Sequence, residues 1–389
     1  MIERNIATKI LSYFKHYPVV TITGPRQSGK TTLCRMLFPK LQYFSLEDID
    51  TRNYARNDPK GFLHDCFKKG AIIDEIQRVP DLTSYIQTIV DEKNKPGLFI
   101  LTGSQNFQVM NTISQSLAGR TALATLLPFS YSEIYKKTSV PVNEILYKGF
   151  YPRIHDKKLN PTEALSFYVS TYLERDVRTL INIKDLSKFE IFLKLCAART
   201  GQILNISGLA NDCGINHNTA KSWLSVLEAS YIVYLLKPHY NNFRKRLIKS
   251  PKLYFTDPGL AAYLLDIKNL SHIDAHPLKG ALFETFIVIE ILKALFNSGN
   301  TSNIYYFRDN IGNEVDLLID CGTKVIPLEI KSGKTINTDF FKGLNYYYKL
   351  NPKSKTGYLV YGGKDNQSRS DTKVISYKAI DELFSSIMK

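Results

Sequence analysis

Residues 24–31 read Gly-Pro-Arg-Gln-Ser-Gly-Lys-Thr, which has the spacing G-x-x-x-x-G-K-[ST]. An apolar, β-branched run at 17–23 precedes this stretch, and a helical pattern follows it. Glycines allow such a loop to curl with its backbone N–H groups pointing inward around a phosphate, and the N-terminus of the following helix adds positive potential. Strand, loop and helix in this order predict a phosphate-binding loop.

Each residue type in this loop has an expected role. The loop backbone surrounds the β-phosphate, Lys30 bridges the β- and γ-phosphates, and the Thr31 hydroxyl ligates Mg²⁺. The predicted cofactors are therefore ATP and Mg²⁺. The predicted nucleotide contacts are Gly24, Pro25, Arg26, Gln27, Ser28, Gly29, Lys30, Thr31 and Thr32.

A second apolar run, at 71–76, carries the acids Asp74 and Glu75. After a phosphate-binding loop, such a run is typical of a Walker B strand. We expect Asp74 to hold Mg²⁺ through water and Glu75 to orient the attacking water.

A third run, at 98–105, has a polar end that could place Thr102 or Ser104 between the two acids and the γ-phosphate. A helix N-cap is the alternative for either residue. Arg120 could stabilise γ-phosphate charge, in its own chain or in a neighbour, and so could Arg153, unless they are surface arginines. The predicted catalytic set is Lys30, Glu75, Ser104 and Arg120. Strands alternating with helices predict a doubly wound parallel sheet, with the nucleotide at the carboxyl ends of its strands.

The middle of the chain has the pattern of a helix-turn-helix. A helical face at 189–196 is followed by a short helix after Asn205, a turn at Gly214, and a helix at 219–227 that Asn216 or Asn218 can cap. Apolar runs at 231–236 and 252–255 would flank a wing. We therefore expect a winged helix. Trp223 is expected in its core.

The wing is strongly basic. Between Glu228 and Asp257 there is no acid, but there are six cations: Lys237, Arg244, Lys245, Arg246, Lys249 and Lys252. Such a run suits contact with DNA phosphates. The predicted DNA contacts are Lys221, Arg244, Lys245, Arg246 and Lys249. The alternative is a winged helix that serves only in packing.

The C-terminal third carries acids on a predicted hairpin. Strands at 313–320 and 324–331 are joined by a two-residue turn, which places Asp316 and Glu329 diagonally on one face, roughly 7–8 Å apart. Carboxylates at that spacing can converge on Mg²⁺, and buried acids without a cation are costly. Lys331 lies on the same face, and Glu284 lies on a helix predicted at 278–296. The predicted metal ligands here are Glu284, Asp316 and Glu329.

The succession GPRQSGKTTL, IIDEIQ, LTGSQN, LAGRT, LLPFSYSE and GFYPRI resembles a prokaryotic family of AAA-type ATPases with a C-terminal domain of unknown function, number 4143. The resemblance covers nearly the whole chain and implies ATP binding and hydrolysis, a sensor residue on the third strand, and a ring in which a neighbour's arginine completes the site. The set Glu284, Asp316, Glu329 and Lys331 resembles the core of the PD-(D/E)xK nucleases. That superfamily includes members that only bind.

Composition sets further bounds. A net charge of +15 over 389 residues indicates a polyanionic partner, nucleic acid before a membrane surface, with a merely soluble basic protein as the alternative. Five scattered cysteines and the absence of a signal-peptide pattern predict the reducing cytoplasm and exclude a disulfide scaffold. No stretch is apolar enough to span a bilayer.

Four domains are expected: a P-loop ATPase core at 1–135, a helical lid at 136–185, a winged helix at 186–272 and a nuclease-like α/β domain at 273–389. The predicted function is a Mg-dependent ATPase that binds DNA and carries a metal-dependent nuclease. The main alternative is an ATP-driven switch whose C-terminal domain binds DNA or protein without cleavage. A regulator with a vestigial nucleotide site is a third.

Overall fold

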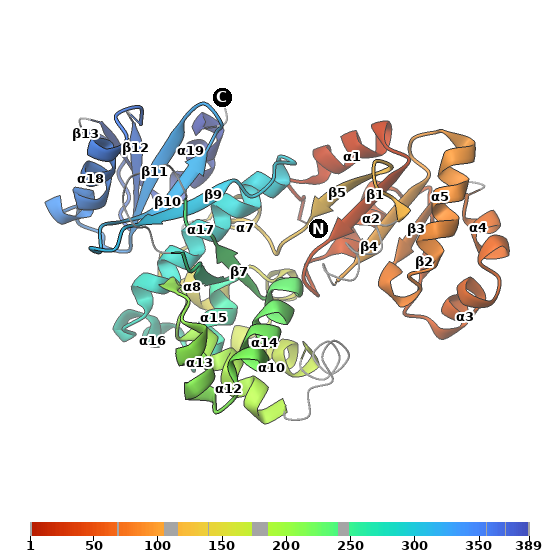
Figure 1. Cartoon of the computed structure of the whole chain (residues 1–389), viewed down its shortest axis with the longest axis horizontal. Coiled ribbons are helices and arrows are strands. Elements are labelled where there is room, and N and C mark those ends of the chain that lie inside the picture. The colour runs from red at the N-terminus through yellow and green to blue at the C-terminus, as the bar shows by residue number, and fades with distance from the viewer. Residues whose placement is uncertain are drawn as a thin grey trace. The chain divides into compact units, whose positions relative to one another are not determined.

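The computed structural model describes residues 2–67, 70–104, 116–138, 140–172, 186–239, 249–354, 356–369 and 371–387 (Figure 1). It divides the chain into two compact units. The first comprises Met1–Phe129, Ala229–Tyr231 and Leu295–Asn300, and the second comprises Ser130–Glu228, Ile232–Ala294 and Thr301–Lys389. The finer division into four domains stays a prediction.

The first unit is built on a five-stranded sheet in the order β2-β3-β4-β1-β5. Every recorded pairing in it is parallel, so the predicted parallel sheet is confirmed. The strands are β1 (Val19–Thr23), β2 (Gln42–Ser45), β3 (Ala71–Asp74), β4 (Phe99–Gly103) and β5 (Thr121–Thr125). Because β4 lies between β1 and β3, the third polar strand end stands between the phosphate-binding loop and the two acids.

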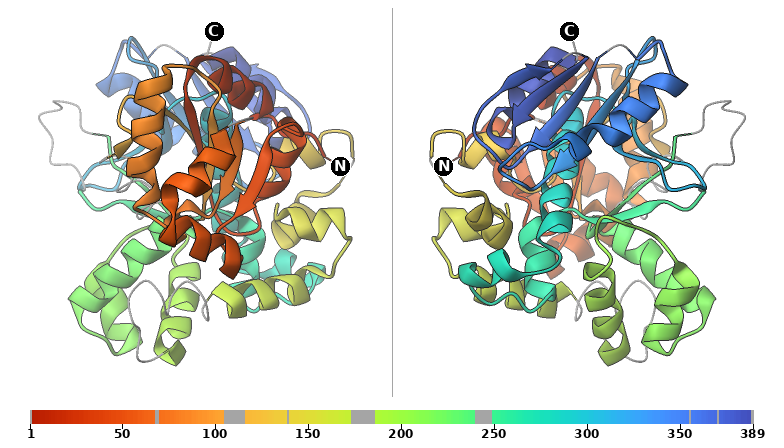
Figure 2. Two further views of the ribbon diagram at one scale, coloured as in Figure 1. Left: turned by 90° about the vertical axis from the view of Figure 1, so that its right-hand side faces the viewer. Right: turned by 90° about the vertical axis from the view of Figure 1, so that its left-hand side faces the viewer.

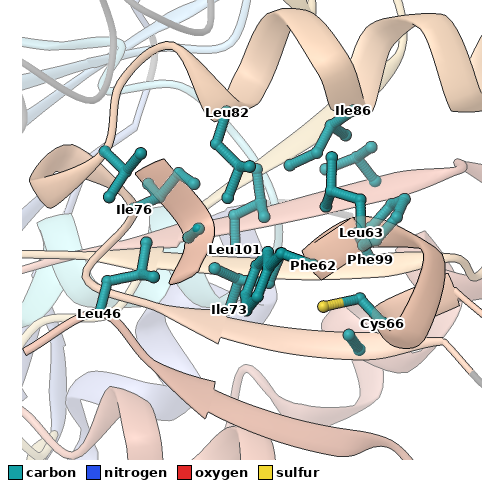
Figure 3. Packing of buried hydrophobic residues seen from close by; sticks show 14 of the residues in the cluster. Leu46, Phe62, Leu63, Cys66, Ile73, Ile76, Leu82, Ile86, Phe99 and Leu101 are labelled. Carbon is teal, nitrogen blue, oxygen red and sulfur yellow. The ribbon is translucent and has the colours of Figure 1, made fainter. Parts of the chain in front are cut away.

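Helices cover both faces of this sheet. They are α1 (Ala7–His16), α2 (Lys30–Leu37), α3 (Ile49–Asn57), α4 (Pro59–Phe67) and α5 (Leu82–Lys93), with a 3₁₀ turn η1 at Ile76–Arg78. On one face, Phe62 and Leu63 of α4 and Ile86 of α5 pack against Ile73 and Phe99 of the strands (Figure 3). On the other face, α1 and α2 contribute Ile10 and Leu33 to a second core. The apolar faces of these helices therefore fix the sheet edge that carries the polar residues.

The second unit contains a three-stranded sheet in the order β6-β8-β7 and three helices that precede or separate its strands. The elements are α12 (Leu186–Ala197), β6 (Gln202–Ile203), α13 (Ile206–Cys213), α14 (His217–Ala229), β7 (Val233–Leu236) and β8 (Lys252–Phe255). Asn205 caps α13, Gly214 ends it in the left-handed region at φ 65°, and Asn216 accepts from Thr219 N. Of the two capping candidates, the structure thus selects Asn216. Trp223 packs edge-on against Phe189 and Phe192, which confirms its place in the core.

A six-stranded sheet in the order β13-β14-β12-β11-β10-β9 follows, drawn in blue in the right-hand view of Figure 2. Its strands are β9 (Ile304–Arg308), β10 (Glu314–Asp320), β11 (Val325–Lys331), β12 (Gly357–Tyr361), β13 (Gln367–Arg369) and β14 (Thr372–Ser376). The pairing of β10 with β9 shifts between Val315 and Leu318, and both of these residues pack against α18. The bulge falls at Asp316 and turns that side chain relative to its neighbours.

The predicted register of the β10–β11 hairpin is wrong by two residues. Asp320 pairs with Val325 and Leu318 with Pro327, and the pairing of the two strands ends at Leu317 and Leu328. The reason is the turn. Gly322 adopts φ 79° and its N–H is accepted by Asp320, so four residues rather than two join the strands. A shift of two keeps the predicted faces of the paired residues 317–320, but the irregularity between Val315 and Leu318 places these two side chains in the same core cluster.

The other helices of this unit are short, apart from α17. They are α7 (Tyr131–Ile134), α8 (Val142–Lys148), α9 (Pro152–Asp156), α10 (Pro161–Tyr172), α15 (Pro258–Leu264), α16 (Leu270–Ala275), α17 (Lys279–Asn297), α18 (Lys342–Leu350) and α19 (Ile380–Ile387), with 3₁₀ turns η3 (Thr338–Phe341) and η4 (Tyr377–Ala379). Among the described residues, no helix is both long and apolar enough to cross a membrane.

Two motifs of the sequence, GFYPRI at 149–154 and LLPFSYSE at 126–133, make buried hydrogen bonds within this unit. The buried Asp257 carboxylate accepts from Phe150 N and Leu260 N, and a Cβ at Gly149 would lie 2.2 Å from it. Glycine at 149 is therefore required by close approach. In the same way, Glu290 of α17 accepts from Tyr131 N at 2.7 Å.

Candidate functional site

The loop between β1 and α2 has the backbone of a phosphate-binding loop. Gly24 adopts φ 148°, and a Cβ there would lie 2.1 Å from the Leu126 carbonyl oxygen. Gly29, the residue before α2, adopts φ 91°, and Gln27 adopts φ 59°. The buried Arg4 guanidinium donates to the Ser28 carbonyl at 2.8 Å and to the Leu127 carbonyl at 2.7 Å. The position of Gly24 therefore requires glycine, because any side chain there would collide with the Leu126 carbonyl.

Lys30 is the first residue of α2 and is 6% exposed. Its ammonium donates to the carbonyl oxygens of Gly24 and Pro25, both at 2.9 Å. Burial lowers the pKa of this ammonium, against the opposing pull of Glu75 and Asp74. Its recorded partners are neutral, so the charge of Lys30 is available to an anion that enters the loop.

The loop also offers hydrogen-bond donors that a nucleotide could use. The Ser28 hydroxyl is buried and has no hydrogen-bond partner. The first N–H groups of any helix have no acceptor within that helix, and those of α2 begin at Lys30. Orphan donors, a buried ammonium and a helix N-terminus together suit the oxygens of a polyphosphate.

Asp74 is surrounded by hydroxyl groups. Thr31 donates to its Oδ2 at 2.9 Å and Tyr43 donates to the same oxygen at 2.7 Å. Thr102, from β4, donates to Oδ1. The predicted Mg²⁺ ligands Thr31 and Asp74 are thus in direct contact, and hard oxygen ligands of this kind suit Mg²⁺. The sequence prediction had no role for Tyr43.

Glu75 directly follows β3 and lies in the left-handed region at φ 59°. Its backbone N–H is accepted by the Thr102 hydroxyl at 3.3 Å. Its Oε2 accepts from Ser104 at 3.1 Å and from the Gln77 amide. A non-glycine residue in this conformation is strained, and such strain gathers at functional sites. Of the two alternatives on the third strand, Thr102 therefore contacts both Asp74 and Glu75, and Ser104 contacts Glu75.

Arg120 lies at the wrong edge of the sheet for a role at the phosphates of its own chain. It precedes β5, whose first residue Thr121 pairs with Val19 at the start of β1. The loop follows the other end of β1, five residues or about 16 Å away. Arg120 instead forms a two-pronged ion pair with Asp91. The in-chain role is corrected, and a role toward a neighbouring chain stays a prediction.

The other arginines near the predicted site are placed as follows. Arg26 of the loop lies 3.8 Å from Glu47, which also lies 3.6 Å from Arg78. Arg153 is exposed on α9 of the second unit. Neither residue is recorded in contact with Asp74 or Glu75.

The nuclease-like residues gather in the second unit. Lys331 donates to Asp316 at 3.0 Å and to Glu329 at 2.7 Å, and Asp316 also accepts from Ile330 N. Burial and the nearby Asp316 raise the pKa of Glu329 to about 8. Glu284, on α17, joins this group only through Lys252. The four predicted residues are therefore close, with their acids partly neutralised.

A second lysine, Lys252, also lies in this cluster. Lys252 of β8 is 2% exposed, and its ammonium lies 3.0 Å from Glu284, 2.5 Å from Glu314 and 4.0 Å from Asp316. Among the described residues, no group of three or more His, Cys, Asp or Glu side chains is arranged to hold a metal ion. Lys252 thus lies among the predicted metal ligands, and the metal set Glu284, Asp316 and Glu329 stays a prediction.

The predicted DNA contacts are only partly described. Lys221 is exposed on α14 and Lys249 is exposed before β8. Arg244, Lys245 and Arg246 lie outside the described residues. Lys252, counted with the basic run, is buried and does not belong to an exposed patch.

Fold and site together define a P-loop domain of the AAA type. Residues 16–135 match the family model of an AAA domain, residues 140–271 that of a domain of unknown function (DUF8612), and residues 279–380 that of a domain of unknown function (DUF4143). An uncharacterized protein of Mycobacterium tuberculosis and one of Mycobacterium bovis are each 31% identical over 340 residues, which cover 86% of this chain and 74% of theirs. The chain belongs to their family, the AAA-type P-loop ATPases with a DUF4143 domain.

Solved structures are more distant. A Walker-type ATPase of Pyrococcus abyssi is 14% identical, with 68% of this chain and 96% of that chain covered and a TM-score of 0.46. AMPPCP-bound DnaA of Aquifex aeolicus is 14% identical, with 58% and 86% covered and a TM-score of 0.30.

Proposed function

We propose that the first unit hydrolyses ATP in a Mg²⁺-dependent reaction. The observation that carries this proposal is the contact between Thr31 and Asp74 at the end of β3, next to the strained Glu75. These groups come from two separate segments, the start of α2 and the end of β3, and meet at the sheet edge where the phosphate-binding loop begins. In this fold that edge is where ligands bind.

The residues divide the chemistry among them. Lys30 can exchange the carbonyl oxygens of Gly24 and Pro25 for phosphate oxygens, which carry full negative charge. Thr31 and Asp74 would hold Mg²⁺, which when bound neutralises charge on the phosphate oxygens. Glu75 orients the attacking water. Ser104 and Gln77 position Glu75 by donating to its Oε2.

The test is Glu75→Gln in the full chain. We expect ATP binding to be retained and turnover to fall by about 10²-fold or more, since the amide cannot act as a base toward water. Glu92→Gln, an exposed acid on α5 of the same unit, is the matched control and should turn over normally. Normal turnover in Glu75→Gln contradicts the proposal.

A second candidate function is binding to DNA. It is supported by the outward face of α14, which exposes His217, Asn218, Lys221, Ser222 and Ser225, with one exposed acid, Glu228, near the end of the helix. Polar and basic side chains on the second helix of a helix-turn-helix suit contact with phosphates and base edges.

Salt-dependent binding measures this function. Reversing the charge of Lys221 should weaken binding and flatten its dependence on salt by about one phosphate contact. The triple reversal of Arg244, Lys245 and Arg246 should have a larger effect. Lys40→Glu, an exposed lysine in the first unit, serves as the control for net charge. Unchanged affinity in both variants would place any DNA contact elsewhere.

For the C-terminal sheet, binding without cleavage is the function that the geometry supports better. Cleavage of the predicted kind needs a divalent cation among Glu284, Asp316 and Glu329. An ammonium already lies among these acids. We therefore propose an ATP-driven switch that binds DNA, in place of an ATP-linked nuclease.

A further inference from the structure

The charged cluster of the second unit draws on four separate elements. Its acids come from α17, β10 and β11, and one of its two lysines comes from β8. The members are Glu284, Glu314, Asp316, Glu329, Lys252 and Lys331. In the sequence, Lys252 is separated from the hairpin acids by about sixty residues, so the fold alone brings it to them.

Lys252 holds a central place in this cluster. Its ammonium is within hydrogen-bond distance of Glu284 and Glu314 and lies 4.0 Å from Asp316. Burial alone would lower its pKa, but Tyr254, Glu284, Asp316 and Glu314 together hold the pKa well above its usual value. Lys252 is therefore a fixed positive charge among at least three carboxylates.

One oxygen of Glu284 and one of Asp316 are already engaged by donors of the chain. Glu284 Oε1 accepts both from Lys252 at 3.0 Å and from the Tyr254 hydroxyl at 2.5 Å. Asp316 Oδ2 accepts from Ile330 N at 2.8 Å and from Lys331 at 3.0 Å. A divalent cation binds carboxylate oxygens at about 2.0–2.6 Å. It could not reach these oxygens without displacing the lysines.

One carboxylate oxygen in the cluster has no partner. Glu329 Oε2 is buried, while Oε1 of the same group accepts from Lys331. A Cβ placed on Gly343 would lie 3.1 Å from Oε2, so this oxygen is next to the start of α18. Mg²⁺ takes six ligands, so this oxygen alone would not hold it.

We propose that Lys252 permanently takes the place of a divalent cation in this cluster. The acids of the cluster and Lys252 then fix β8 to the six-stranded sheet, and no metal binds there. These contacts also fix the end of the basic run, because Lys249 lies three residues before Lys252. This proposal does not depend on ATP hydrolysis in the first unit.

The experiment is Mn²⁺ titration of the nucleotide-free full chain, followed by electron paramagnetic resonance. Four proteins are compared: wild type, Asp316→Asn, Lys252→Met, and the double variant Lys252→Met/Asp316→Asn. Methionine keeps the length of the lysine stem without its charge. Any Mn²⁺ held by Thr31 and Asp74 is common to all four and cancels in the differences.

We expect wild type and Asp316→Asn to bind Mn²⁺ identically. Lys252→Met should gain one Mn²⁺ per chain, with an affinity about tenfold or more above any wild-type binding at this place, and the double variant should lose it. A Lys252→Met chain that unfolds in metal-free buffer and refolds with Mn²⁺ supports the proposal equally.

Two results would overturn the proposal. The first is a wild-type Mn²⁺ site that Asp316→Asn removes, and this arm does not depend on the folding of Lys252→Met. The second is a folded Lys252→Met chain that gains no Mn²⁺. Neither result bears on the ATPase proposal, which Glu75→Gln tests separately.

Discussion

Lys30 and Lys252 are both almost fully buried lysines beside acids, yet their electrostatic surroundings are opposite. Lys30 donates to two carbonyl oxygens, and burial lowers its pKa. Lys252 lies among carboxylates that hold its pKa well above the usual value. A buried charge paired only with dipoles favours an incoming anion, whereas a charge already paired with carboxylates has little left to offer one. Lys30 is therefore suited to bind an anion, whereas Lys252 is suited to neutralise buried acids of its own chain.

The largest expected effect is on stability at Lys252. Lys252→Met should lower the free energy of unfolding by about 3–5 kcal/mol, because it leaves Glu284, Glu314 and Asp316 buried without their cation. Chemical denaturation of the metal-free protein measures this. A loss below about 1 kcal/mol would mean that the lysine is not needed by its acids, and the contrast with Lys30 would fail.

Lys30→Met should have the reverse profile. Its ammonium is partnered only by carbonyl groups, so we expect little loss of stability but a fall in ATP turnover of about 10²-fold or more. Steady-state turnover and denaturation are measured on the same preparation. Lys40→Met, an exposed lysine of the same unit, is the control. Retained turnover in Lys30→Met would remove the assignment of the phosphate-binding loop.

Much of the first site could be predicted from the sequence because its signals are local. The loop, the acids at 74–75 and the polar end of the third strand each lie within a few residues of an apolar run. The parallel sheet then brings these runs to one edge. Tyr43 was missed because a tyrosine on a short strand has no pattern that distinguishes it from core.

The second cluster was less predictable because it depends on distant segments. Alternation predicts the faces of the hairpin strands except at the irregularity between Val315 and Leu318, and their register depends on how many residues form the turn at Gly322. Lys252 was grouped with the basic run because its neighbours are cations, and only the packing of β8 reveals its partners. The need for a cation could be predicted from the buried acids, but its chemical identity could not.

A smaller effect on ATP affinity is expected when one of the hydroxyl groups around Asp74 is removed. Tyr43→Phe removes one of three hydroxyl donors and leaves the ring in place. We expect a loss of about 0.5–1.5 kcal/mol in Mg²⁺-dependent ATP affinity, which is a change of a few-fold. Phe44→Tyr would be a poor control because Phe44 packs in the core, so Tyr17→Phe on the surface is used. A change of more than 10²-fold would make Tyr43 a member of the catalytic set.

The smallest expected effect concerns Arg120, which lies at the far edge of the sheet from the loop. Its partner Asp91 is exposed, and surface ion pairs of this kind contribute little to stability. Arg120→Ala should therefore leave the melting temperature and ATP binding by a single chain unchanged. If Arg120 acts on a neighbour's nucleotide, turnover should fall only at protein concentrations at which wild type associates, and mixing with Glu75→Gln chains should restore part of it, because each variant supplies the group that the other lacks. Equal turnover of Arg120→Ala and wild type at every concentration would make Arg120 a surface arginine, and Arg153 would then be the next arginine to test.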